Sequence, residues 1–143
     1  MSDPDHLFAP RATPVFGHKG MVAASQPLAV QTALDILVMG GNAADSAVAA
    51  AAVLAVTEPT STGIGGDCFA LYFDSRTQTI SALNGSGRAP AALNLDLLRS
   101  QDFEHELPRF HVHTVTVPGA CAAWDDLVAK HGRLSLKLFL HRP

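Results

Sequence analysis

The sequence predicts an α+β fold, on the basis of two helical stretches, a pair of strands and one more helix. Between Ser25 and Gly40, apolar residues recur at the spacing of one helix face. The following run, 43–56, is alanine-rich and apolar on every side, which is typical of a buried central helix. Residues 68–74 are rich in aromatic and apolar residues, which predicts a buried strand. Residues 79–83 follow a turn and alternate as a return strand, so the two predict an antiparallel hairpin.

Length and composition are those of a single globular domain. The chain has 143 residues, of which 48% are hydrophobic and 16% are charged, so it can form one core. Its net charge is -3 and its pI is about 6.1, and its basic residues do not cluster into a stripe. These values argue against nucleic acid as a partner, because a nucleic-acid-binding surface is strongly basic.

The N-terminal residues 1–19 are polar and punctuated by prolines, which predicts an extended lead-in. They contain no apolar run that could serve as the core of a secretory signal. The apolar run 43–56 is shorter than the roughly 20 residues that a membrane helix needs, and it contains Asp45. We therefore expect no membrane partner and a cytoplasmic location.

Turn and cap residues mark the ends of the predicted helices. Residues 20–24 predict a short strand, and Ser25 is positioned to cap the helix that follows it. Pro27 falls in the first turn, where its missing N–H leaves no hydrogen bond unmade. A glycine pair ends this helix, and Asn42 is positioned to cap the next one. Asp45 lies three residues further on, where a carboxylate favours the start of a helix.

The threonine, serine and glycine residues of 60–67 raise the question of a phosphate-binding loop. Such a loop follows a strand, opens a helix and usually carries a lysine. Residues 60–67 instead follow a helix, lead into a strand and contain no lysine. We therefore interpret them as a tight structural loop.

Four further elements are predicted in the second half of the chain. Residues 84–90 form a second glycine-rich turn, and residues 94–100 favour a short helix. Residues 111–117 alternate between apolar and polar, which predicts a third strand. A turn at Pro118 leads into a final helix. The apolar side of that helix carries Trp124, Leu127 and Val128.

The histidines and the paired acids do not predict a metal or catalytic centre. His111 and His113 share one face of the predicted strand, and His105 is close in sequence, so a metal site is conceivable. No further ligand is spaced to complete a zinc site, so we expect solvated imidazoles and no metal. Asp125 and Asp126 are neighbours on a helix and do not converge on one point, which predicts a solvated face.

The two cysteines, Cys68 and Cys121, stand alone in apolar surroundings, outside any Cys-x-x-Cys spacing. This context favours buried free thiols. A disulfide between them stays open as an alternative, because the sequence does not give their separation in space.

Four motifs follow one another along the chain. They are GMVAASQPLA, LVMGGNAADSAVAAAAVLAVTEPTSTGIGGDCFALYFD, NGSGRAPAAL and TVTVPGACAAWDDLVAKHGRLSL. Together they closely resemble the N-terminal part of the large subunit of the gamma-glutamyltranspeptidase (gamma-glutamyltransferase) family, over about residues 20–136. The resemblance implies an N-terminal fragment of the N-terminal nucleophile hydrolase fold, an αββα sandwich with two central sheets. It also implies transfer or hydrolysis of gamma-glutamyl groups, with glutathione as the usual donor and no cofactor.

In that family the catalytic threonine stands at the start of a small subunit, where self-cleavage exposes it. Its own α-amine can serve as the base that activates its hydroxyl. Nothing in this chain resembles the processing site, so the resemblance implies no catalytic residue here and a C-terminal half as partner. Thr57, Thr60 and Thr62 match the large-subunit loop of the family instead.

The resemblance also suggests a substrate-binding position in the loop 84–92. When the loop is aligned on Ala89 and Pro90, the family's carboxylate-binding arginine falls on Ser86, and Arg88 lies two residues later. An arginine is suited to bidentate carboxylate binding, so Arg88 could take that role after a shift of the loop. The alternative is that Arg88 caps a turn or pairs with a nearby acid.

Residues 137–143 depart from the long helix with which the family continues. Our hypothesis is a truncated, frameshifted or split gene product, inactive without the half that carries the nucleophile. Two other functions stay open: an acylase or amidohydrolase of the same fold with a different acyl group, and a non-catalytic partner of a full-length paralogue. We also expect the isolated chain to aggregate through open strand edges.

Overall fold

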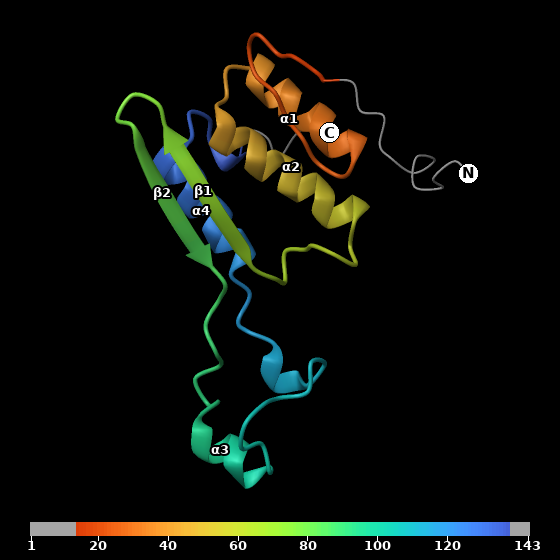
Figure 1. Ribbon diagram of the computed structural model, residues 1–143, viewed down its shortest axis with the longest axis vertical. Helices are drawn as coiled ribbons and strands as arrows, with labels where there is room; N and C mark the ends of the chain where they lie inside the picture. Colours follow the sequence, from red (N-terminus) through yellow and green to blue (C-terminus); the bar gives the residue numbers. More distant parts are fainter. Residues whose placement is uncertain (1–13, 138–143) are drawn as a thin grey trace, which may run out of the picture.

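The computed structural model describes residues 14–137, so most of the predicted lead-in and tail lies outside the described residues. The chain forms a main body of helices and a hairpin, and a small projecting segment that carries a short α-helix and a 3-10 helix (Figure 1). In chain order the elements are α1 (Pro27–Val38), α2 (Ala43–Thr57), β1 (Cys68–Asp74), β2 (Thr79–Gly85), α3 (Leu95–Ser100), the 3-10 helix η2 (Val112–Thr114) and α4 (Ala120–His131).

The main body is arranged around α2 and α4. Helix α1 packs along α2, and α4 packs against both strands of the hairpin and against α2. In Figure 1, α4 lies behind the hairpin, while α3 sits at the far end of two extended connections. The core between α2, α4 and the hairpin includes Val48, Trp124 and Leu127, all buried. The fold is therefore α+β, as the sequence predicts.

Both ends of α1 lie close to where the sequence predicts them, but its N-cap is a different residue. Gln26 is the N-cap of α1 in place of the predicted Ser25, and its side chain makes no capping hydrogen bond. The Gln26 amide is instead directed to Glu58, donating to its carboxylate at 3.1 Å. At the other end of α1, Gly40 has a φ of 93°, which favours glycine, and the N–H of Gly41 donates to a carbonyl of the last turn.

The predicted cap of α2 is confirmed, and one of its residues also bonds a distant part of the chain. The side-chain oxygen of Asn42 accepts hydrogen bonds from the N–H groups of Ala44 and Asp45, at 3.0 and 3.2 Å. Asp45 in turn accepts from the N–H of Asn42 at 2.8 Å. The Asp45 carboxylate is completely buried, and it also accepts from the N–H groups of Arg133 and Leu134, at 3.0 and 3.4 Å. One side chain thus joins the start of α2 to the chain that follows α4.

Helix α2 is buried over its first half only. Ala44, Val48 and Ala49 have at most 3% of their surface exposed, whereas Val56 is 79% exposed. The expectation of a helix buried along its whole length is therefore wrong for the second half, which is only half-buried against α1 and the core. In residues 14–137, no helix has both the length and the apolar character needed to cross a membrane.

The predicted hairpin is confirmed, with β1 and β2 antiparallel and Tyr72 opposite Ser81. Its inner face is half-buried against α2 and α4. The outer face carries Phe69, Leu71 and Phe73, which are 55 to 80% exposed. The prediction of a fully buried strand is wrong for this face, because nothing in residues 14–137 packs on it. An open apolar face of this kind is consistent with the expected aggregation of the isolated chain.

Two predicted strands are absent from residues 14–137. Residues 20–24 are extended but unpaired, and residues 111–117 contain the 3-10 helix η2. Local hydrogen bonds explain the second difference. The His111 ring accepts from the N–H of His113 at 3.2 Å, and the Thr114 hydroxyl donates to the His111 carbonyl at 2.7 Å. These bonds turn the chain where alternation alone predicts extension.

Candidate functional site

Three glycine-containing loops that are far apart in the sequence meet at the start of α4. The N–H groups of Gly119 and Ala120 both donate to the carbonyl of Gly66 at 3.0 Å. The N–H of Val117 donates to the carbonyl of Arg88 at 2.9 Å. We call the meeting point of the loops 63–66, 85–88 and 116–119 the glycine junction. The loop 60–67 is thereby a structural loop, as the sequence predicts.

The glycine junction leaves no room for side chains at its centre. A Cβ on Gly87 would collide with the Val117 carbonyl, and the φ of Gly87 is 76°. A Cβ on Gly119 would lie 2.6 Å from the N–H nitrogen of Gly87 and would also meet the Gly85 carbonyl. In the sequence each of these glycines belongs to a separate turn, and no pattern there indicates that the turns converge. Glycine is needed here because one backbone approaches another.

A pocket of about 550 Å³ adjoins the glycine junction, and this volume lies within the roughly 300–1,000 Å³ that is typical of small-molecule sites. The loop 85–88, the turn at Pro118 and the first turns of α4 line it, so the predicted residues Ser86 and Arg88 share one wall. Asp126 lies on the α4 side of the same pocket. The structure therefore brings both predicted site residues together at a concave surface.

The surroundings of Ser86 and Arg88 differ. Ser86 is half-buried, and its carbonyl accepts a hydrogen bond from the Thr116 hydroxyl at 3.0 Å. Arg88 is exposed, and in residues 14–137 its guanidinium makes no ion pair and no side-chain hydrogen bond. The turn-capping or ion-pairing alternative for Arg88 is thus not observed. A role for either residue in substrate binding stays a prediction.

Within residues 14–137, the threonines beside the first glycine loop have no catalytic partner. The Thr57 hydroxyl donates to the Val53 carbonyl of its own helix at 3.1 Å. Thr60 and Thr62 lie in the turn after Pro59, where the N–H of Thr62 donates to the carbonyl of Glu58 at 3.1 Å. Neither arrangement supplies a base to a hydroxyl.

The histidines near η2 and the paired aspartates of α4 lie in different surroundings. His113 hydrogen-bonds the Gln101 side chain at 2.9 Å, and no group of three potential metal ligands gathers in residues 14–137. The rings of His111 and His113 do lie together, with centroids 4.8 Å apart, but the predicted strand is wrong, because His111 caps the 3-10 helix η2. Asp125 and Asp126 are both exposed on α4, which confirms the predicted solvated face.

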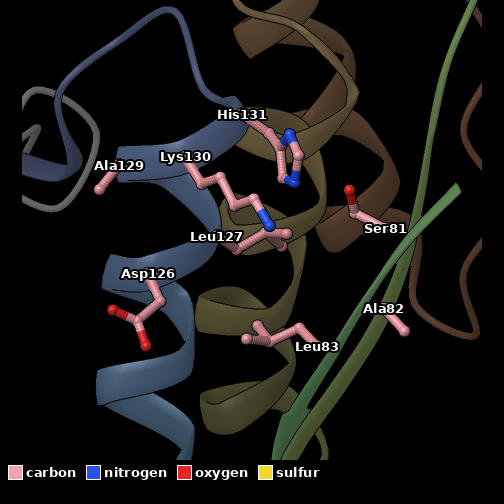
Figure 2. A pocket seen from close by; sticks show the side chains of 8 residues that line it. All are labelled: Ser81, Ala82, Leu83, Asp126, Leu127, Ala129, Lys130 and His131. Atoms are coloured by element: carbon pink, nitrogen blue, oxygen red, sulfur yellow. The ribbon is translucent and has the colours of Figure 1, made fainter. Parts of the chain in front are cut away.

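A second pocket, of about 420 Å³, lies between β2 and the C-terminal half of α4 (Figure 2). Figure 2 shows Lys130 and His131 extending from α4, with Ser81 on the opposite strand side of the opening. Leu83 and Leu127 form its apolar floor. The His131 ring stacks on Tyr72, and within residues 14–137 no hydrogen bond joins it to Ser81, so no base is held against the Ser81 hydroxyl there.

The two cysteines are free thiols in different surroundings. Cys121 is exposed on the first turn of α4, so its predicted burial is wrong, whereas Cys68 faces the core. Burial raises the pKa of the Cys68 thiol above its ordinary value, although a hydrogen bond with Trp124 acts in the opposite direction.

We expect iodoacetamide at neutral pH to alkylate Cys121 about tenfold faster than Cys68, because the thiolate is the reactive form and access matters. Mass spectrometry of timed samples would measure both rates. In the urea-unfolded chain, which serves as the control, the two rates should converge. Equal rates in the folded chain would show that Cys68 is not shielded.

Comparison with known proteins now decides the family. The sequence model described as Gamma-glutamyltranspeptidase matches residues 29–142. This chain belongs to the gamma-glutamyltranspeptidase family. The Glutathione hydrolase-like YwrD proenzyme of Bacillus subtilis (strain 168) is 41% identical over 123 residues, which cover 85% of this chain and 23% of the relative. The family resemblance of the sequence motifs is thus confirmed.

Solved structures place this fold within larger proteins. The gamma-glutamyltranspeptidase of Helicobacter pylori superposes with a TM-score of 0.77 at 28% identity, covering 89% of this chain and 37% of that one. The cephalosporin acylase of Bacillus halodurans superposes with a TM-score of 0.70 at 46% identity, covering 89% of this chain and 25% of that one. The chain is therefore an α+β unit that matches part of these enzymes and spans less than a quarter of the B. subtilis relative.

Proposed function

We propose that this chain forms the N-terminal part of an enzyme that transfers or hydrolyses gamma-glutamyl groups, with glutathione-type donors. The observation that carries the proposal is the family match over residues 29–142. The names of similar proteins, which include glutathione hydrolase proenzymes, support the substrate class. In this proposal the finer fold is the αββα sandwich, and a C-terminal half supplies the second sheet.

The proposed chemistry needs a group that the described residues lack. An N-terminal threonine of the C-terminal half would attack the gamma-carbonyl carbon, with its α-amine taking the hydroxyl proton. The amide C–N bond breaks, the leaving amine takes the proton, and an acyl ester remains on the threonine. Water or an acceptor amine then attacks the ester and regenerates the hydroxyl. Backbone N–H groups would hold the oxyanion in both steps.

The contribution of this chain is proposed to be the wall of the donor site beside the glycine junction. Arg88 is exposed at the pocket and, in residues 14–137, is not engaged by an acid, so its guanidinium is available to a substrate carboxylate. The Arg88 backbone is fixed, because its carbonyl accepts from the N–H of Val117. Ser86, on the same wall, offers a hydroxyl to the same group.

We expect Arg88→Ala to raise the KM for a gamma-glutamyl anilide roughly 10- to 100-fold, through loss of a charge-assisted contact. The assay would mix this chain with a separately expressed C-terminal half of a relative and follow anilide release. Arg99→Ala is the matched control, because Arg99 lies on α3 and pairs only with the exposed Asp96. An unchanged KM would remove Arg88 from the donor site.

The second candidate function is an acylase or amidohydrolase with a different acyl group. It is favoured by the 46% identity to the B. halodurans cephalosporin acylase and by Ser86 at the family's arginine position. The same mixed sample, tested with other amides, separates the two functions. Turnover of the gamma-glutamyl anilide supports the first, turnover of other amides alone supports the second, and association without turnover would indicate a non-catalytic partner.

A further inference from the structure

A second polar region lies at the opposite end of α4 from the glycine junction. It is a pocket of about 370 Å³ between the turn end of the hairpin, the last turn of α4 and the start of α2. Arg76 comes from the hairpin turn, Lys130 and His131 from the end of α4, and Arg133 from the chain just after it. Lys130, His131 and Arg133 lie within the last of the four motifs, but the proposed donor site does not include them or Arg76.

The pocket is strongly cationic in a chain that is acidic as a whole. Three permanently charged cations, Arg76, Lys130 and Arg133, line it together with one carboxylate, Asp74, which leaves a net charge of +2 before His131 is counted. The whole chain carries -3. Local positive charge of this size attracts anions.

The acids next to the pocket do not neutralise it. Asp74 accepts from the N–H of Arg76 at 2.9 Å, which lowers the pKa of Asp74, and the Arg76 guanidinium adds a contact at 3.5 Å. The Arg76 side chain remains 88% exposed and can turn toward a ligand. Asp45 does not line the pocket, and its completely buried carboxylate accepts hydrogen bonds from the N–H groups of Asn42 and Arg133. In residues 14–137, no ion pair engages Lys130 or Arg133.

Compensation of a helix dipole does not account for the whole cluster. Cations often gather at a helix C-terminus because its free carbonyls carry partial negative charge. Two carbonyls at the end of α4 are already satisfied: that of His131 accepts from the Asn42 amide, and that of Val128 accepts from the N–H of Gly132. Arg76 comes from a different element, and so its presence is not explained by α4.

The floor of the pocket is held in place before any ligand binds. The rings of Tyr72 and His131 stack, with centroids 4.3 Å apart and planes 17° apart. The backbone of Arg133 is anchored by its N–H bond to Asp45 at 3.0 Å. A pocket with a fixed floor loses less conformational entropy when it binds a ligand.

We propose that this pocket binds the phosphate group of a small molecule. A dianionic phosphate matches the net charge of +2, and its several oxygens match donors that approach from the hairpin and from α4. Arginine guanidinium groups bind such oxygens with paired hydrogen bonds. The ligand is either inorganic phosphate or a phosphate monoester. This site is separate from the proposed donor site, so its test does not depend on acyl transfer.

Calorimetric titration of the full chain with inorganic phosphate at constant ionic strength tests the proposal. We expect saturable binding, weakened at least about tenfold in the double variant Arg76→Gln and Arg133→Gln, because two charge-assisted contacts are lost. Gln keeps the backbone N–H of residue 133 that binds Asp45, so the fold is preserved, and circular dichroism checks this. Arg99→Gln, on α3, is the matched control and should bind phosphate within about twofold of the original chain.

A parallel titration with glycerol phosphate identifies the source of the phosphate group. Tighter binding than inorganic phosphate supports a monoester, with the pocket of Figure 2 next to Lys130 and His131 taking the rest of the molecule. Tighter binding of inorganic phosphate supports the free ion. The proposal is overturned if neither compound saturates the chain, or if Arg99→Gln weakens binding as much as the double variant.

Discussion

Replacing Asp45 with alanine should lower the free energy of unfolding by about 3 kcal/mol, because buried hydrogen-bond donors would lose their acceptor. The carboxylate is completely buried and accepts from the N–H groups of Asn42, Arg133 and Leu134. Alanine removes all three bonds and leaves a space in the core. Urea unfolding followed by fluorescence would measure the change, because the single tryptophan, Trp124, is only 6% exposed in the same core.

Asp35→Ala is the matched control for this prediction. Asp35 is exposed on α1, and its carboxylate accepts one hydrogen bond from the Gln31 side chain at 2.8 Å. We expect its removal to change stability by less than about 0.5 kcal/mol. Asp45→Asn should fall between the two, because the amide keeps one acceptor and has lost the charge. If Asp45→Ala were as mild as the control, the link between α2 and the end of α4 would carry no stability.

Only some of the Asp45 hydrogen bonds could be predicted from the sequence. The local half of this arrangement, Asn42 as a cap with Asp45 three residues later, follows from residue types and spacing. The other half joins Asp45 to the N–H of Arg133, 88 residues away. A backbone N–H has no residue-type signature, so no pattern in the sequence predicts which distant donor a buried carboxylate will accept from.

Strand prediction was right where a partner strand exists and wrong where none does. The hairpin of β1 and β2 is confirmed because each strand satisfies the hydrogen bonds of the other. Residues 111–117 have the alternation of a strand, but the backbone groups of 111–115 bond locally around Thr114, and only the N–H of Val117 reaches a distant carbonyl, that of Arg88. Alternation describes side chains only, and the backbone decides between a strand and a turn according to the partners in reach.

The outer face of the hairpin was misjudged for a different reason. Phe69, Leu71 and Phe73 alternate with the inner-facing residues of β1, so the strand is apolar on both sides and burial on both sides is the expected result. The structure covers only the inner side.

The residues of the candidate site could be identified from the sequence, but the surface on which they lie could not. Ser86 and Arg88 were singled out from one loop, and the structure adds the wall opposite them, formed by Pro118 and the first turns of α4. The glycine junction that fixes this wall depends on three loops that are separated along the chain. The junction forms because backbone segments of these loops lie very close together. Substitution of its glycines therefore tests whether it exists.

Gly87→Ala should destabilise the chain by about 2–4 kcal/mol, the second large effect that we expect. The φ of 76° at Gly87 is unfavourable for any residue with a Cβ, and that Cβ would collide with the carbonyl of Val117. Val117 donates its N–H to the carbonyl of Arg88, so a shift that relieves the collision would also break this bond. The same urea unfolding experiment measures the loss, and in the reconstituted enzyme the KM for the donor should rise with it.

Gly65→Ala is the control, because it places a methyl group on another glycine of the same junction. No atom lies within 4 Å of a Cβ at Gly65, in contrast to Gly87. We expect Gly65→Ala to change stability by less than about 0.5 kcal/mol, since neither strain nor collision opposes it. A large loss in both variants would mean that the junction tolerates no change at all, whereas a small loss in both would refute the close approach of Gly87 to Val117. Only a large loss confined to Gly87→Ala agrees with loops held together by backbone contact.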